Sequence, residues 1–98
     1  MDLSASTFIP RGVFSGSALE TIRLPRCLRK VGKFAFVNCK RLKNISFDTD
    51  SILEEIGVQA FYGAGLESFA ALPSLRKIDS MAFAECSALR DLRLNDTI

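Results

Sequence analysis

Large apolar residues recur along this chain with a period far longer than that of one helix or strand. Four phenylalanines stand 22, 25 and 22 residues apart: Phe14, Phe36, Phe61 and Phe83. An aliphatic residue precedes each phenylalanine by five positions: Ile9, Val31, Ile56 and Ile78. A leucine follows each one, and a second large apolar residue comes three positions later: Leu19 and Ile22, Leu42 and Ile45, Leu66 and Phe69, Leu89 and Leu92. The chain therefore consists of about four units of 22 to 25 residues, which we call coils one to four.

The coils differ slightly in length. The leucine follows the phenylalanine by five residues in coils one and three and by six in coils two and four, and coil two has two further residues within positions 48–51. Such differences are typical of loops rather than of the repeated core.

Within each coil the apolar pattern predicts two extended segments. The segments 21–24, 44–47, 68–71 and 91–94 alternate between outward and inward residues, as a half-buried strand does. A second extended segment is expected at 28–31, 53–56 and 75–78. Between the two, stretches such as "GKFAFVNC" favour a tight helical or 3₁₀ turn with the phenylalanine inward. Stacked coils would then form one continuous core beneath a parallel ladder of strands.

A helix is the competing interpretation of one segment. In "SILEEIGVQAF", Ile52, Ile56 and Ala60 recur near helical spacing. This interpretation accounts for one coil and leaves the agreement among the other three unexplained, so the repeat is favoured.

Two longer stretches resemble a known family. "LPRCLRKVGKFAFVNCKRLKNI" and "LPSLRKIDSMAFAECSALRDL" are similar to the BspA-like leucine-rich repeat, and the similarity runs from about Ile9 to Leu94. Asp79 departs from the pattern, since glycine holds that place in coils two and three. The resemblance implies an α/β repeat protein, rich in β-structure, that forms a leucine-rich-repeat solenoid. It also implies a binding or adhesion module, often on bacterial or protist surfaces, without a catalytic motif.

Composition limits the alternatives. The 98 residues are 48% hydrophobic with a net charge of +2, so we expect one domain over residues 1–98, alone or as a fragment of a longer array. No apolar run is long enough for a membrane span, and the first residues do not resemble a signal peptide. As written the chain is expected in the cytoplasm, whereas the resemblance implies a cell surface, so the compartment stays open.

Enzymatic and metal chemistry are not expected. The chain has no histidine, which removes the commonest general base and metal ligand, and the adjacent Glu54 and Glu55 would point to opposite faces of a strand. Cys39 and Cys86 occupy equivalent positions two coils apart, about 10 Å by strand spacing, which exceeds the reach of a disulfide. We expect both to fill buried space, and the role of Cys27 stays open. No cofactor and no metal are predicted.

Charge is segregated between the coils. Residues 23–43 include eight basic and no acidic residues, and residues 44–67 include five acidic and no basic ones. Stacking would place Arg29 and Lys30 beside Glu54 and Glu55, and these beside Arg76 and Lys77, as a ladder of alternating charge. The remaining cations would form a basic patch on the turns: Arg26, Lys33, Lys40, Arg41 and Lys43. Such a patch suits an acidic protein or an anionic polymer; nucleic acid is less favoured, because no exposed aromatics are interleaved to stack on bases.

The sequence thus predicts a non-enzymatic protein-interaction module. Its binding face would be the outward strand positions Thr21, Arg23, Asn44, Ser46, Ser68, Ala70, Asp91 and Arg93. The alternative is a structural subunit that stacks end-on with another chain, as a homo-oligomer or complex, through an assembly edge formed by Leu89, Leu92 and Leu94.

Overall fold

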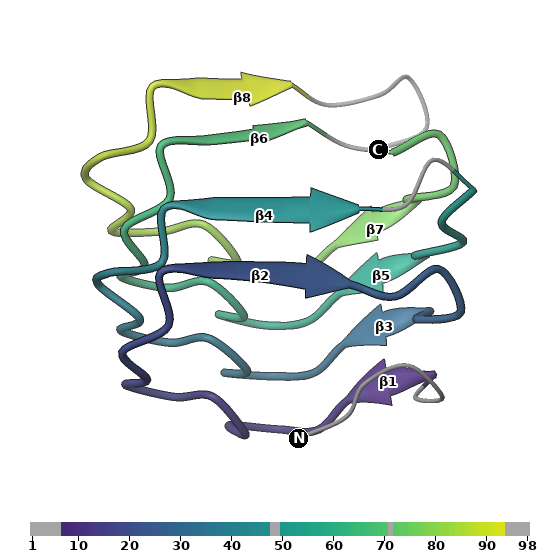
Figure 1. Cartoon of the computed structure of the whole chain (residues 1–98), viewed down its shortest axis with the longest axis horizontal. Coiled ribbons are helices and arrows are strands. Elements are labelled where there is room, and N and C mark those ends of the chain that lie inside the picture. Colours follow the sequence, from purple (N-terminus) through teal and green to yellow (C-terminus); the bar gives the residue numbers. More distant parts are fainter. Residues whose placement is uncertain (1–6, 48–49, 71, 94–98) are drawn as a thin grey trace.

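The chain winds through four coils of a solenoid whose paired strands are all parallel. The structure, a computed structural model, describes residues 7–47, 50–70 and 72–93. Each coil contains one two-residue strand and one strand of three or four residues, so the described residues hold eight strands (Figure 1). The predicted solenoid of parallel strands is confirmed, and the helical interpretation of 51–61 is wrong, since this segment contains a strand.

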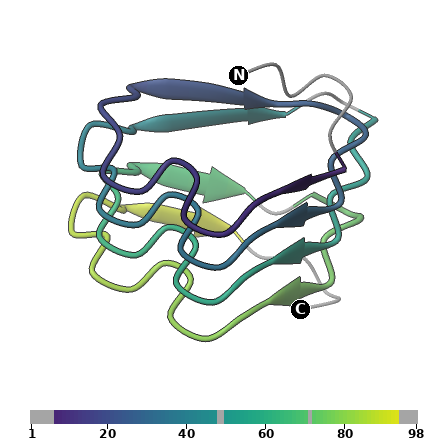
Figure 2. The ribbon, with the colours of Figure 1, turned by 90° about the horizontal axis from the view of Figure 1, so that it is seen from below.

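The strands lie on two opposite sides of the coil, with the core between them (Figure 2). One side, which we call the strand face, carries the longer strands β2 (Thr21–Leu24), β4 (Asn44–Phe47), β6 (Ser68–Ala70) and β8 (Asp91–Arg93). The other carries β1 (Phe8–Ile9), β3 (Lys30–Val31), β5 (Glu55–Ile56) and β7 (Lys77–Ile78). Position 71, expected to end one strand, lies outside the described residues.

The two sides differ in continuity. The short strands form one four-stranded sheet in the order β1-β3-β5-β7, in which Ile9, Val31 and Ile56 occupy aligned positions. On the strand face the ladder is interrupted between β4 and β6, giving the separate pairs β2-β4 and β6-β8. The predicted parallel ladder is therefore present on this face as two separate pairs. The break coincides with Phe69, which is bulkier than Ile45 at the equivalent inward position and packs its ring against Phe47 and Phe83.

The segment between the two strands is a series of turns and not a helix. The amides of Ala35, Val37 and Cys39 bond within the coil to the carbonyls three residues earlier. The alternate amides, those of Phe34, Phe36 and Asn38, bond instead to carbonyls of coil three. A helix would use all its amides internally, so the expected helical or 3₁₀ turn is replaced by turns that also join the coils. In the part of the chain that the structure describes, no helix suited to crossing a membrane occurs.

These turns require left-handed backbone at two places per coil. The residues two before and two after each core phenylalanine have φ between 52° and 68°: Gly12, Gly16, Phe34, Asn38, Gln59, Gly63, Met81 and Glu85. Only three of the eight are glycine, although a side chain in this conformation costs about 1 kcal/mol. Of the other five, Phe34, Asn38 and Gln59 are held by hydrogen bonds from their amides to the next coil.

The core phenylalanines point inward, as expected, and form a stacked column. Ring centroids of successive residues lie 5.2, 5.1 and 5.4 Å apart from Phe14 to Phe83, in offset stacks within 12° of parallel. Phe36 and Phe61 are fully buried, whereas Phe14 and Phe83, in the outer coils, are half-buried.

Two cysteines pack beside this column as expected. Cys39 and Cys86 are buried with free thiols, and each Sγ donates a hydrogen bond to the phenylalanine carbonyl of the preceding coil. The Sγ–O distances are 2.9 Å to Phe14 and 3.0 Å to Phe61. Burial raises the pKa of both thiols and outweighs the opposing hydrogen bonds from nearby backbone amides. Cys27 is half-buried and also free of a disulfide.

Candidate functional site

The outward side chains of the strand face are all accessible. Every predicted position is exposed: Thr21, Arg23, Asn44, Ser46, Ser68, Ala70, Asp91 and Arg93. The parallel register places Arg23 beside Ser46 and Ala70 beside Arg93, so the side chains form aligned rows within each strand pair. The strand face is thus a polar surface of small side chains, in which the two arginines are the longest.

The inward positions of the same strands are buried or partly buried except in coil four. Leu24 and Phe69 are buried, and Ile22 and Ile45 are partly so. Leu92, expected to point inward, has 44% of its surface exposed. No further strand in the described residues pairs with the outer side of β8, so nothing there covers Leu92. Leu89 is half-buried, and Leu94, the third residue of the expected assembly edge, lies outside the described residues.

The five surplus cations do not lie at one place. Lys40, Arg41 and Lys43 are exposed at the corner that precedes β4, whereas Arg26 follows β2 at the opposite end of the strands, and Lys33 lies on the turns after β3. Arg26 forms an exposed ion pair with Asp50, with 3.4 Å between Nη1 and Oδ2. The predicted basic patch is therefore divided into separate parts, of which only the corner carries several cations together.

The predicted charge ladder exists in part. Lys30, Glu55 and Lys77 are aligned across three strands, and Lys30 Nζ lies 3.2 Å from Glu55 Oε2. Lys77 Nζ instead approaches Asp79 of its own coil, at 3.6 Å. Because these groups lie at the surface, each pair contributes about 0.2–1 kcal/mol and serves mainly to fix the order of stacking.

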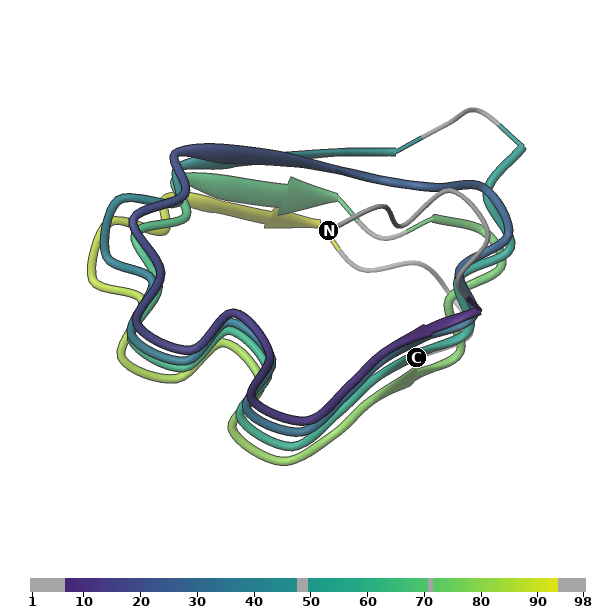
Figure 3. The same ribbon diagram turned by 60° about the horizontal axis from the view of Figure 1, so that its bottom comes forward.

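A groove at the corner before the long strands was not predicted from the sequence. The corners of coils two and four lie farther out than those of coils one and three (Figure 3). Coil three has one residue fewer here than its neighbours, and its corner is Gly63-Ala64-Gly65. At Gly65 a Cβ atom would collide with the carbonyl oxygen of Lys40, so the coil can lie this deep only without a side chain. The shorter distance from phenylalanine to leucine in coil three was visible in the sequence. That it produces a groove depends on the longer corners of the neighbouring coils.

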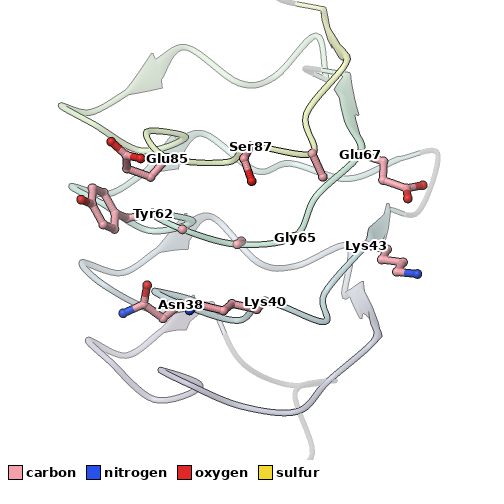
Figure 4. Close-up of a pocket in the computed structure, with 11 residues that line it drawn as sticks. Asn38, Lys40, Lys43, Tyr62, Gly65, Glu67, Glu85 and Ser87 are labelled. Carbon is pink, nitrogen blue, oxygen red and sulfur yellow. The ribbon is translucent and has the colours of Figure 1, made fainter.

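The groove has two walls, a floor and two ends (Figure 4). Asn38 and Lys40 of coil two form one wall, and Glu85 and Ser87 of coil four form the other. Gly63–Gly65 form the floor of this open groove, which has a volume of about 560 Å³.

The two ends of the groove differ in character. Tyr62 lies at one end, and Lys43 and Glu67 lie at the end nearest the strands. Two lysines and two glutamates line the site, so their charges cancel. The lining is thus a single aromatic ring with hydrogen-bonding side chains on both sides.

The described residues do not bring together a metal-binding group. They contain no cluster of three or more cysteine, aspartate, glutamate or histidine side chains that could hold an ion. Glu54 and Glu55, adjacent in sequence, are both half-exposed.

Comparisons with known proteins agree with this geometry. A family model described as "BspA type Leucine rich repeat region (6 copies)" matches residues 7–98. The comparison with curated proteins found no match.

Solved structures share the fold. The pneumococcal vaccine antigen PcpA is 30% identical over 92% of this chain, with a TM-score of 0.86. A leucine-rich cell surface protein from Faecalibacterium prausnitzii A2-165 is 23% identical over 81% of the chain, with a TM-score of 0.71. A leucine-rich repeat protein from Bacteroides ovatus ATCC 8483 is 27% identical over 78%, with a TM-score of 0.52. The matched parts are 22%, 22% and 25% of those chains, so this chain spans a quarter of their length or less.

Proposed function

Because the chain belongs to the BspA-type leucine-rich repeat family, we propose that it is a protein-interaction module that binds a macromolecular partner through its strand face. Proteins of this family generally serve as interaction or adhesion scaffolds, and one similar structure is described as a cell surface protein. The module holds rigid strands in register and presents their outward side chains, without catalysis.

The observation that carries this proposal is the exposure of all eight outward side chains of the strand face. Six of them stand on β2, β4 and β6, whose inner side chains pack in the core, so little backbone freedom is lost there when a partner binds. Asp91 and Arg93 stand on β8, which is held by its pairing with β6. Arginine is enriched at the centres of interfaces, and Arg23 and Arg93 are the only long side chains in these rows. We therefore assign them the largest share of the binding energy.

Site-specific photo-crosslinking tests the strand face directly. A photoreactive phenylalanine at Ser46, an exposed position in β4, should form a covalent adduct with the partner in the native extracellular or cellular mixture. The same group at Lys33, exposed outside the strand face, is the matched control and should give no such adduct. Once a partner is identified, the double variant Arg23→Glu/Arg93→Glu should weaken its binding by at least tenfold. Adducts from Lys33 but not from Ser46, or unchanged affinity of the double variant, would place the contact elsewhere.

End-on assembly is the second candidate, and the exposure of Leu92 favours it. A hydrophobic residue 44% exposed beside the outer edge of β8 is suited to be covered by a further strand. Light scattering of the purified chain across a range of concentrations distinguishes the two functions. If the chain self-associates and Leu92→Lys abolishes the association, assembly through this edge is supported. If the chain is a monomer at all concentrations, the interaction module is the only one of the two functions that is supported.

A further inference from the structure

The groove between coils two and four is separate from the strand face and has its own chemistry. Its floor, Gly63–Gly65, carries no side chain larger than a methyl group, so a ligand can approach the backbone itself. Its volume of about 560 Å³ falls within the range of small-molecule sites. The shorter corner of coil three creates the groove, and the paired long corners beside it form the walls.

The lining favours two of the usual ligand classes less. Phosphates and nucleic acids require a surplus of positive charge, whereas here Lys40 and Lys43 are balanced by Glu67 and Glu85. Peptides are recognised through a free sheet edge, a row of apolar pockets or an aromatic-lined channel. The groove lies at a corner before the strands, and it contains one aromatic ring and no large aliphatic side chain.

The aromatic ring and the polar side chains of the groove together fit a sugar. The ring of Tyr62, half-exposed at one end of the groove, offers a flat apolar face for the C–H bonds on one side of a pyranose. The Asn38 amide, the Glu85 carboxylate and the Ser87 hydroxyl lie on both sides and supply donors and acceptors for hydroxyl groups (Figure 4). Open, shallow walls leave room for a chain of sugars to continue beyond the groove.

We propose that this groove binds a neutral oligosaccharide, with one sugar ring stacked on Tyr62 and its hydroxyls bonded to Asn38, Glu85 and Ser87. Asn38 and Glu85 occupy equivalent positions of coils two and four, and both have left-handed backbone with φ of 58° and 59°. The backbone turns thus set the two polar side chains on opposite sides of Gly63. The same position in coil one is Gly16, which supplies no such side chain.

Amide chemical-shift titration of the ¹⁵N-labelled chain tests the proposal. The probes are maltotriose, cellotriose and chitotriose, each added to tens of millimolar, because a shallow site of this kind is expected to bind with a Kd on the order of 1 mM. At least one probe should shift the signals of Gly63, Ala64 and Gly65 saturably. The strand-face amides of Ser46 and Ser68 should not move.

Three variants and one control separate stacking from hydrogen bonding. Tyr62→Ala should raise the Kd by at least tenfold, whereas Tyr62→Phe keeps the ring and should change it by less than threefold. Glu85→Gly, which the left-handed backbone accommodates, should raise the Kd severalfold. Ser46→Ala on the strand face is the control and should leave the Kd unchanged.

Three results would overturn the inference. One is the absence of saturable shifts at the groove with all three sugars, and another is equal binding by Tyr62→Ala in a chain whose spectrum remains folded. Shifts of the same amides by a peptide that contains lysine and glutamate, but not by the sugars, would assign the groove to a protein partner. Each of these leaves the crosslinking test of the strand face unaffected, so the two proposals fail independently.

Discussion

Phe36 and Phe61 lie one above the other in consecutive coils, with ring centroids 5.1 Å apart and ring planes 1° from parallel. Both are fully buried and stand at the centre of the four-ring column. The two residues are 25 positions apart in the sequence, so one period of the repeat separates two rings that are in contact. This contact also joins the two oppositely charged coils, whose surface charges alone would contribute little.

Truncation of either central ring should unfold or nearly unfold the chain. Phe36→Ala or Phe61→Ala removes a fully buried ring, which typically lowers the free energy of unfolding by about 3–5 kcal/mol, a large part of the total for a small domain. Thermal unfolding followed by circular dichroism measures the effect. Phe8→Ala is the control, since Phe8 is 56% exposed and should shift the midpoint by only a few degrees. Equal midpoints for Phe36→Ala and Phe8→Ala would contradict the packing of the column.

Glycine at a strained turn position should stabilise the chain. Glu85 is exposed with φ of 59°, a conformation that disfavours side chains. We expect Glu85→Gly to raise the free energy of unfolding by about 0.5–1 kcal/mol, after the loss of backbone entropy is included. Ser87→Gly, also exposed but outside the left-handed positions, is the matched control and should lower it. Urea titrations of both variants decide the matter: a decrease for Glu85→Gly would mean that the turn does not store this strain.

The buried thiols should make stability depend on pH. Because burial raises the pKa of Cys39 and Cys86, the folded chain keeps protons that the unfolded chain has released. This contribution is fully present below the ordinary thiol pKa of 9.0 and is lost as the pH rises through the higher folded-state pKa. Urea midpoints should therefore fall more steeply above pH 9.0 for the native chain than for the double variant Cys39→Ala/Cys86→Ala. Parallel curves for the two proteins would count against buried, protonated thiols.

The ion pair between Lys30 and Glu55 should couple two coils weakly. A double-mutant cycle with Lys30→Ala and Glu55→Ala is expected to give a coupling energy of about 0.2–1 kcal/mol that decreases with added salt. The pair Arg26 and Asp50 is the comparison, because its side chains are 72% and 64% exposed against 50% and 29% for Lys30 and Glu55. Its coupling should be smaller. A larger coupling for the more exposed pair would show that burial does not govern these interactions.

The repeat in the sequence by itself determined most of the fold. Each coil contacts mainly the next one, so residues that share a place in the period must share a place in the core, and the alignment of Ile9, Val31 and Ile56 followed directly. Alternation of period two likewise determined which strand residues face outward, because successive side chains of a strand point to opposite sides. The strand face was therefore predictable residue by residue.

Only the tertiary structure revealed those features that depend on differences between neighbouring coils. Alternate amides of the turns bond within a coil and to the next coil, a division that became visible only once the coils were stacked. The break in the strand ladder at Phe69, whose ring packs against Phe47 and Phe83, likewise depends on contacts between coils. The groove arises in the same way: the sequence of coil three supplies a short corner of glycine and alanine, but a short corner becomes a binding surface only when longer corners stand on both sides of it.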